Sequence, residues 1–138
     1  MLETHDLREV EIEGLEIDLD SIFNNFVANS VASLINTDVS PKEIIMTLSV
    51  DHDRVIVDFV DNGHGLADEY QNNPEIIFSA FETSVVDRNG NKIGTGMGLY
   101  IVRGIIDSYQ DADVCILSVS QGFGIRVMFK MKKSEISE

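Results

Sequence analysis

The chain has 138 residues, and 24 aspartates and glutamates against 10 lysines and arginines give it a formal net charge of -14. This length predicts one domain, and 43% hydrophobic with 25% charged residues is the composition of a globular protein with a single core. The acidic balance excludes recognition of a nucleic-acid backbone or of an acidic membrane surface, because both need clustered lysine and arginine.

No apolar run is long enough to span a membrane, and the first residues lack the basic start and apolar stretch of a secretion signal. The single cysteine, Cys115, cannot form an internal disulfide, and its place in an apolar alternating run indicates a packing role. These features predict a cytoplasmic protein whose chain makes no membrane contact.

The first twenty residues carry eight carboxylates and one arginine, which is half of the net charge. We expect residues 1–16 to form an acidic lead-in or an edge strand. Residues 21–37 carry no charge, and apolar residues recur there at helical spacing. A helix is therefore expected over this stretch, with Asp20 or Ser21 as its N-cap.

Polar side chains are expected at two places on the border of the core. Asn25 and Asn29, four residues apart, lie together at one edge of the helix's apolar face. Two strands follow, Ile44 to Val50 and Arg54 to Asp61, and alternation puts Asp61 on the apolar face of the second. A buried carboxylate needs a partner, so we expect Asp61 to meet backbone amides or a ligand.

Glycines mark the loops that come next. Asp61 to Gly65 (DNGHG) forms a turn, Ile76 to Phe81 is a short apolar segment, and Glu82 to Lys92 is a polar loop. Gly94 to Gly98 (GTGMG) then opens a helix. Closely spaced glycines at the start of a helix let backbone N–H groups approach an anion. Taken alone, this cluster fits a plain tight turn as well as a phosphate site, so other motifs must decide between them.

Two final strands, Val114 to Ser120 and Ile125 to Met131, precede a short tail. The order of strands and helices predicts an α/β fold, a two-layer α/β sandwich in which a mixed, mostly antiparallel sheet carries its helices on one face.

Four segments, in this order and spacing, resemble the GHKL superfamily of ATP-binding domains, which includes gyrase, MutL, heat-shock chaperones and histidine kinases. They are the N box IFNNFVANS (22–30), the first glycine box DNGHGL (61–66), the F box IFSAF (77–81) and the second glycine box GTGMGLYIV (94–102). The resemblance implies a GHKL-type ATP-binding domain over residues 17–132, with residues 1–16 as lead-in and residues 133–138 as tail.

The resemblance also assigns roles to single residues. It implies that Asn29 ligates Mg²⁺ and that Asn25 assists at the metal or the phosphates, so that both are catalytic. Asp61 would accept a hydrogen bond from the exocyclic amine of adenine, and residues 82–93 would be the ATP lid. The other expected nucleotide contacts are Gly63, Gly65, Leu66, Phe81, Lys92, Gly94, Thr95, Gly96, Met97, Gly98 and Leu99.

Position 25 selects the branch of the superfamily. Hydrolytic members place a glutamate general base there, whereas histidine kinases carry asparagine, as this chain does. The resemblance therefore implies the catalytic ATP-binding domain of a histidine kinase in a two-component signalling system. Such a domain transfers the γ-phosphoryl group of Mg-ATP to a histidine on another domain, in cis or in trans, which then passes it to a response-regulator-like protein.

Two alternatives stay open. A stand-alone serine kinase of the anti-sigma-factor type would carry glutamate in place of Asn25. A non-catalytic module, in which the lid reports bound ATP to a partner, fits Ala32, since kinases often carry a basic phosphate contact at that position. In the catalytic interpretation Arg88, Lys92 or Arg103 would supply the missing charge.

Overall fold

The computed structural model describes residues 11–35, 37–79, 81–83, 89, 97–119 and 121–132. The elements are α1 (Glu16–Ile35), β1 (Ile44–Asp51), β2 (Arg54–Asp61), the 3-10 helices η2 (Asp68–Tyr70) and η3 (Pro74–Phe78), α2 (Gly98–Asp107), β3 (Asp113–Leu117) and β4 (Phe123–Lys130). Within these ranges, no helix has the length and apolar character that crossing a membrane requires.

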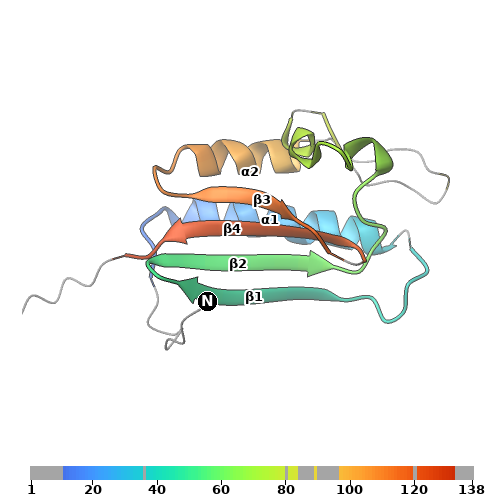
Figure 1. Ribbon diagram of the computed structural model, residues 1–138, viewed down its shortest axis with the longest axis horizontal. Helices are drawn as coiled ribbons and strands as arrows, with labels where there is room; N and C mark the ends of the chain where they lie inside the picture. Colours follow the sequence, from blue (N-terminus) through green and yellow to red (C-terminus); the bar gives the residue numbers. More distant parts are fainter. Residues whose placement is uncertain are drawn as a thin grey trace, which may run out of the picture.

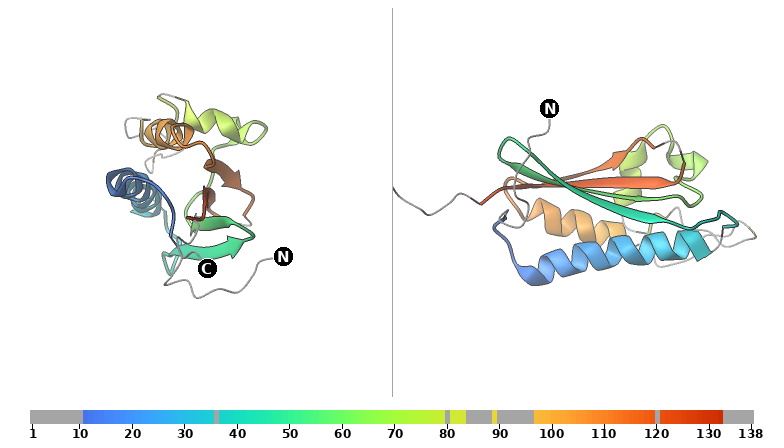
Figure 2. Two further views of the ribbon diagram at one scale, coloured as in Figure 1. Left: turned by 90° about the vertical axis from the view of Figure 1, so that its left-hand side faces the viewer. Right: turned by 90° about the horizontal axis from the view of Figure 1, so that it is seen from below.

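The strands form one sheet in the order β1-β2-β4-β3, and all its pairs are antiparallel (Figure 1). Both α-helices lie side by side on one face of this sheet, α1 against β2 and α2 against β3 (Figure 2). The expected two-layer sandwich is confirmed, and the sheet is antiparallel throughout its described strands. The strands begin and end within three residues of their expected limits.

The core fills the space between the two helices and the helix-facing side of the sheet. The alternation expected for β2 is confirmed, because Val55, Val57, Phe59 and Asp61 are all buried. The apolar face expected for α2 is also confirmed. The buried cluster consists of Ile22, Phe26, Phe59, Tyr70, Ile77, Phe78, Leu99, Val102, Ile106, Val114, Ile125, Val127 and Phe129.

The described residues of the lead-in, 11–15, meet the sheet at the end of β4. Ile12 forms an isolated antiparallel bridge with Met131, and the N–H of Lys132 donates to the carbonyl of Glu11 at 2.6 Å. Residues 11–15 therefore touch the end of β4 without forming a strand, and residues 1–10 lie outside the described part.

Helix α1 begins at Glu16, five residues earlier than expected, so the N-caps assigned to Asp20 and Ser21 are wrong. The reason lies far away in the sequence. The hydroxyl of Tyr109 accepts the N–H of Leu15 at 2.9 Å and donates to Asp18 at 2.8 Å. Its ring packs edge-on against Phe129, with the ring centroids 6.2 Å apart. Tyr109 thus takes the place of a cap and fixes the first turn of α1 to the core.

Replacing Tyr109 with Phe should lower the free energy of unfolding by about 1–2 kcal/mol, because the Leu15 N–H and Asp18 lose their partner. Burial raises the pKa of Tyr109, and Asp18 adds to this, while the bond from Leu15 opposes it. Since the folded pKa lies above the unfolded one, this stability is present below pH about 10 and lost as the pH rises through the folded value. Urea titrations from pH 7 to 11 should show the two proteins converging, and a difference independent of pH would contradict this role.

Candidate functional site

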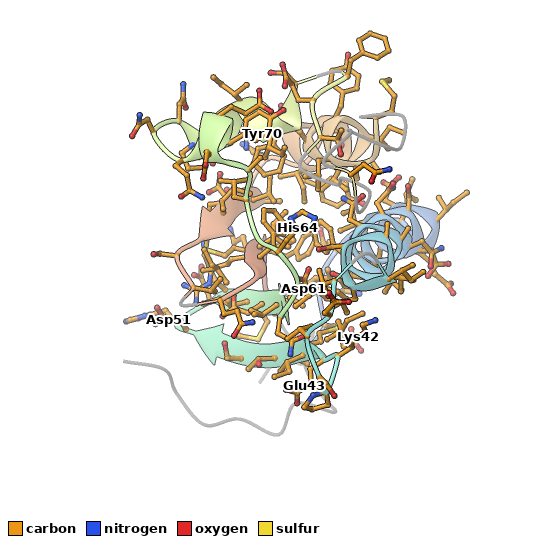
Figure 3. The ribbon with its side chains drawn as sticks, turned by 90° about the vertical axis from the view of Figure 1, so that its right-hand side faces the viewer. Lys42, Glu43, Asp51, Asp61, His64 and Tyr70 are labelled. Atoms are coloured by element: carbon orange, nitrogen blue, oxygen red, sulfur yellow. The ribbon has the colours of Figure 1, made fainter. Side chains whose placement is uncertain are left out.

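The site is built around Asp61, whose side chain lies at the end of β2 beside α1 (Figure 3). The residue is only 3% exposed. Its Oδ1 accepts the N–H of Gly63 at 2.9 Å, and its Oδ2 accepts the hydroxyl of Ser30 at 3.0 Å. The expected backbone amide is confirmed, and the helix adds a second donor. Because each carboxylate oxygen has two acceptor positions, Asp61 can still accept a hydrogen bond from a ligand.

Ser33 lies one turn beyond Ser30 and is also buried. Among the described side chains, its hydroxyl is the buried polar group without a hydrogen-bond partner. A Cβ added to Gly63 would overlap Ser33 Oγ and lie 3.1 Å from Asp61 Oδ1, so the hydroxyl and the carboxylate meet at the same glycine. Sequence reasoning missed Ser30 and Ser33. The signal that could have found them is that both are small residues on the side of the helix that faces the core.

Replacing Ser33 with Ala should raise the free energy of unfolding by about 1 kcal/mol in the absence of nucleotide, because an unpaired buried hydroxyl is removed. Replacing Ser30 with Ala is the matched control. It should lower the same quantity by about 1.5–3 kcal/mol, because the buried Asp61 loses a donor. Urea unfolding of both variants tests the contrast. A loss of stability in Ser33→Ala would show that this hydroxyl has a partner in solution.

The turn after β2 crosses the turn before β4 with backbone against backbone. Gly122 has φ of +88°, and a Cβ on it would overlap the carbonyl oxygen of Asp61 and lie 2.7 Å from the carbonyl carbon. Gly65 has φ of +80°, and its Cβ would lie 2.7 Å from the carbonyl oxygen of Gly122. L side chains rarely adopt this left-handed region, and neither position has room for one. The crossing holds the strand end that carries Asp61.

The two asparagines of α1 face the start of α2. A Cβ on Gly98 would lie 2.8 Å from Asn25 Oδ1 and 3.8 Å from Asn29 Oδ1. Asn25 is held in place because its Nδ2 donates to the carbonyl of Ser21 at 2.8 Å. Two amide oxygens therefore gather at the N-terminus of α2, where the first N–H groups of a helix have no acceptor within it and can bind an anion.

A surface groove of about 400 Å³ runs along α1 next to this point. The residues that line it are Ile17, Asp20, Ser21, Asn24 and Asn25. Asp20 is the charged member of that set, so the groove places a carboxylate and three polar side chains on the same side of α1 as the amide oxygen of Asn25.

The other expected contact residues differ in their location and in their burial. Met97 and Gly98 are half-buried at the start of α2, next to the asparagines. Leu66 packs against the core cluster, and Leu99 lies within it. Phe81 is 78% exposed, with φ of 69°. The contacts expected of Lys92, Gly94, Thr95 and Gly96 fall outside the described residues.

Arg103 is one of the three expected compensating charges, and the structure shows acidic neighbours around it. One guanidinium nitrogen lies 3.6 Å from Glu75 Oε1 and donates to the carbonyl of Val114 at 3.3 Å, and Nε lies 3.6 Å from Asp107 Oδ1. The guanidinium also lies over the ring of Phe78. Two carboxylates therefore oppose the charge that Arg103 was expected to supply, and the other two candidates, Arg88 and Lys92, lie outside the described residues.

Tyr70 is a further residue that sequence reasoning missed. It is buried, and its hydroxyl donates to Glu82 Oε2 at 2.5 Å, with the carbonyl oxygen of Thr83 at 3.3 Å. The expected lid begins at Glu82, so Tyr70 anchors the segment where that loop leaves the core.

The same fold occurs in solved structures that include two histidine kinases. The Mycobacterial sensor histidine kinase MprB has a TM-score of 0.68 and 16% identity over 91% of this chain and 78% of its own. The catalytic domain of histidine kinase ThkA, in a nucleotide-free form, has a TM-score of 0.67 and 22% identity over 86% of this chain and 70% of its own. Full-length ShkA in complex with AMPPNP has a TM-score of 0.61 and 25% identity over 91% of this chain and 24% of its own.

The model of one protein family, described as histidine kinase-, DNA gyrase B-, and HSP90-like ATPase, matches residues 14–135. The chain belongs to this family. Membership confirms the resemblance that the four sequence boxes carry, and it supports an ATP-binding, kinase-like domain.

Proposed function

We propose that the chain is the ATP-binding catalytic domain of a histidine-kinase-like signalling protein. One observation supports the proposal: α1 contacts a buried aspartate with a free acceptor position through Ser30, and two asparagine oxygens of the same helix face the start of α2. Mg-ATP presents an exocyclic amine at its base end and a hard cation at its phosphate end. A carboxylate acceptor suits the amine, and amide oxygens suit the cation.

The base end belongs to Asp61, which would accept a hydrogen bond from the amine of adenine while Ser30 and Gly63 hold its carboxylate in place. The loop from Gly63 through Gly65 to Leu66 would border the base. Met97, Gly98 and Leu99 would continue the site at the start of α2, and Phe81 would join it from the F box. Lys92, Gly94, Thr95 and Gly96 would surround the phosphates.

The metal end belongs to Asn29, with Asn25 beside it. The donor set fits Mg²⁺, because amide oxygens are hard ligands, and no cluster of three or more His, Cys, Asp or Glu among the described residues offers a competing metal site. When bound, Mg²⁺ would neutralise phosphate charge. Asn25 would position the γ-phosphoryl group through its amide, which the bond to Ser21 holds in one orientation.

The transfer step needs no general base from this chain. An amide at position 25 cannot take a proton from water, so the site is suited to hold ATP for an acceptor that is itself a nucleophile. The imidazole nitrogen of a histidine on another domain meets that requirement. Its product would then pass the phosphoryl group to a response-regulator-like protein.

A radiolabelled transfer assay tests the proposal. The chain would be incubated with γ-labelled ATP, Mg²⁺ and a histidine-bearing helical hairpin domain, and any labelled protein would be treated with acid. We expect an acid-labile label on the hairpin, absent with an Asn29→Ala variant. An acid-stable label would overturn the assignment in favour of a serine kinase.

A second candidate function is a nucleotide-gated binding module without transfer activity. It is favoured by Ala32 together with the position of Arg103, whose guanidinium is engaged by Glu75 and Asp107. In the same assay this function predicts tight binding of Mg-ATP with no label on any acceptor.

A further inference from the structure

The two edge strands of the sheet, β3 and β1, differ in how they are covered. The edge at β3 is short, the side chain of Arg103 bonds the carbonyl of Val114 there, and η3 packs against it. The edge at β1 runs for eight residues, and among the described residues no strand pairs with its outer side. Natural proteins protect edge strands with charge, proline or a cover, because free N–H and C=O groups invite another strand. Between Ile44 and Val50 the sequence has neither charge nor proline.

The register of the β1-β2 hairpin shows which groups point outward. Asp51 pairs with Arg54 across the turn, and at the other end Glu43 exchanges bonds with Asn62: the N–H of Asn62 donates to the Glu43 carbonyl, and the Glu43 N–H donates to Asn62 Oδ1. Odd-numbered residues of β1 therefore bond inward to β2. The N–H and C=O groups of the even-numbered residues point away from the sheet, and these residues are Ile44, Met46, Leu48 and Val50.

The side chains along this edge are apolar and uncovered. Met46 is 59% exposed and Ile45 54%, one on each face of the strand. Val27 and Val31 of α1 are exposed as well. Helical spacing puts them on the side of α1 opposite Asn25 and Asn29, which face α2. Because α2 packs against β3 and α1 against β2, that side of α1 faces the β1 end of the sheet (Figure 2). A strand added beside β1 would bury apolar side chains on both of its faces.

The charges at the two ends of β1 select the occupant. Glu43 and Asp51 stand on the face of the sheet away from the helices, and Asp53 follows in the turn. Among the described residues, the basic groups near them are three. Arg54 pairs with Asp51 across the hairpin, and its guanidinium lies 3.5 Å from Asp113 Oδ2. The Nδ1 of His52 lies 2.7 Å from Asp51 Oδ1, and Lys42 lies nearer α1 (Figure 3). A second copy pairing with antiparallel two-fold symmetry would set Glu43 against Asp51, and each copy carries a net charge of -14. Like charges at both ends disfavour that dimer.

We propose that β1 is a docking edge for an extended, basic segment of a partner protein. The segment adds a strand to the sheet, its backbone bonds Ile44, Met46, Leu48 and Val50, and its lysine or arginine side chains pair with Glu43 and Asp51. Ile44, at one end of this edge, pairs with Asp61, but its outward N–H and C=O groups point away from the sheet and are not among the groups assigned to the nucleotide. The inference therefore does not rest on the proposed kinase function.

The test uses the full chain without nucleotide and a ten-residue peptide of alternating valine and threonine with two lysines at each end. Calorimetry should show this peptide binding at least tenfold more tightly than the same peptide with glutamates at its ends. A third peptide, N-methylated at alternate residues, cannot form the ladder and should not bind. Amide hydrogen exchange should slow at Ile44, Met46, Leu48 and Val50 on binding.

Variants of the edge make the result specific. Met46→Pro removes an outward N–H and should weaken binding at least tenfold, while Met46→Ala keeps that N–H and should bind nearly as the native chain does. Glu43→Lys should reverse the preference between the two charged peptides, and Glu13→Lys, with the same charge change in the lead-in, should not. The second pair decides the question if Met46→Pro does not fold.

Three results would overturn the inference. Equal binding of the lysine and glutamate peptides would remove the charge selection. A dimer in sedimentation that Met46→Pro dissolves would make a second copy the occupant. Protection of the β1 amides in the free chain, lost on deletion of residues 1–10, would make the chain's own lead-in the occupant.

Discussion

Replacing Asp61 with Asn is expected to abolish ATP binding, lowering the affinity at least a hundredfold, or about 2.8 kcal/mol. The reason is the number of donors that converge on this side chain. The Gly63 N–H and the Ser30 hydroxyl already donate to the two carboxylate oxygens, and an adenine amine would be a third donor. An amide offers one acceptor oxygen and turns its NH₂ toward another donor, so the base loses its acceptor. Calorimetry with Mg-ATP measures the loss.

Asp58→Asn is the matched control for that experiment. Asp58 lies on the same strand but on its other face, where the guanidinium of Arg126 donates to its two carboxylate oxygens at 2.6 and 2.8 Å. This variant should lose some stability and keep its affinity for ATP. Undiminished binding in Asp61→Asn, with Asp58→Asn also binding normally, would sink the assignment of the base site.

Features that depend on residues near one another in the sequence were predicted correctly. The position of Asp61 on the buried face of β2 followed from strand alternation alone, and its need for donors followed from the cost of burying a charge. Asn25 and Asn29 were expected to point together from the edge of the helix, and they do, toward Gly98. The order of the elements then predicted the two layers, because each has one apolar face to cover.

Contacts between distant residues decided the rest. The start of α1 depends on Tyr109, which lies 94 residues beyond Leu15, and no periodicity near Leu15 carries that information. Arg103 was expected to supply a missing positive charge, and only the packing of η3 shows that Glu75 lies opposite it. Ser30 belongs to the N box but, like Ser33, had no role expected of it, so the contact of both with the Asp61 turn appeared only once α1 was packed against the sheet.

Replacing Gly122 with Ala is expected to have the largest effect on stability, lowering the free energy of unfolding by more than about 3 kcal/mol. Its φ of +88° already disfavours a side chain, and the added Cβ would overlap the Asp61 carbonyl oxygen. That neighbour is backbone inside a paired strand, so it cannot move without breaking the β2-β4 ladder, in which Asp61 pairs with Phe123. Urea or thermal unfolding measures the change.

Gly104→Ala is the control for the same substitution in open space. No atom lies within 4 Å of a Cβ at Gly104, which is in the interior of α2, so this variant should gain about 0.5–1 kcal/mol from the lower entropy of its unfolded state.

The same two variants also test whether the turn crossing positions the candidate site. Because the clash at Gly122 displaces the strand end that carries Asp61, Gly122→Ala should bind ATP more weakly even under conditions where it is fully folded, whereas Gly104→Ala should bind normally. Normal binding by folded Gly122→Ala would show that the turn crossing supports the fold without positioning Asp61.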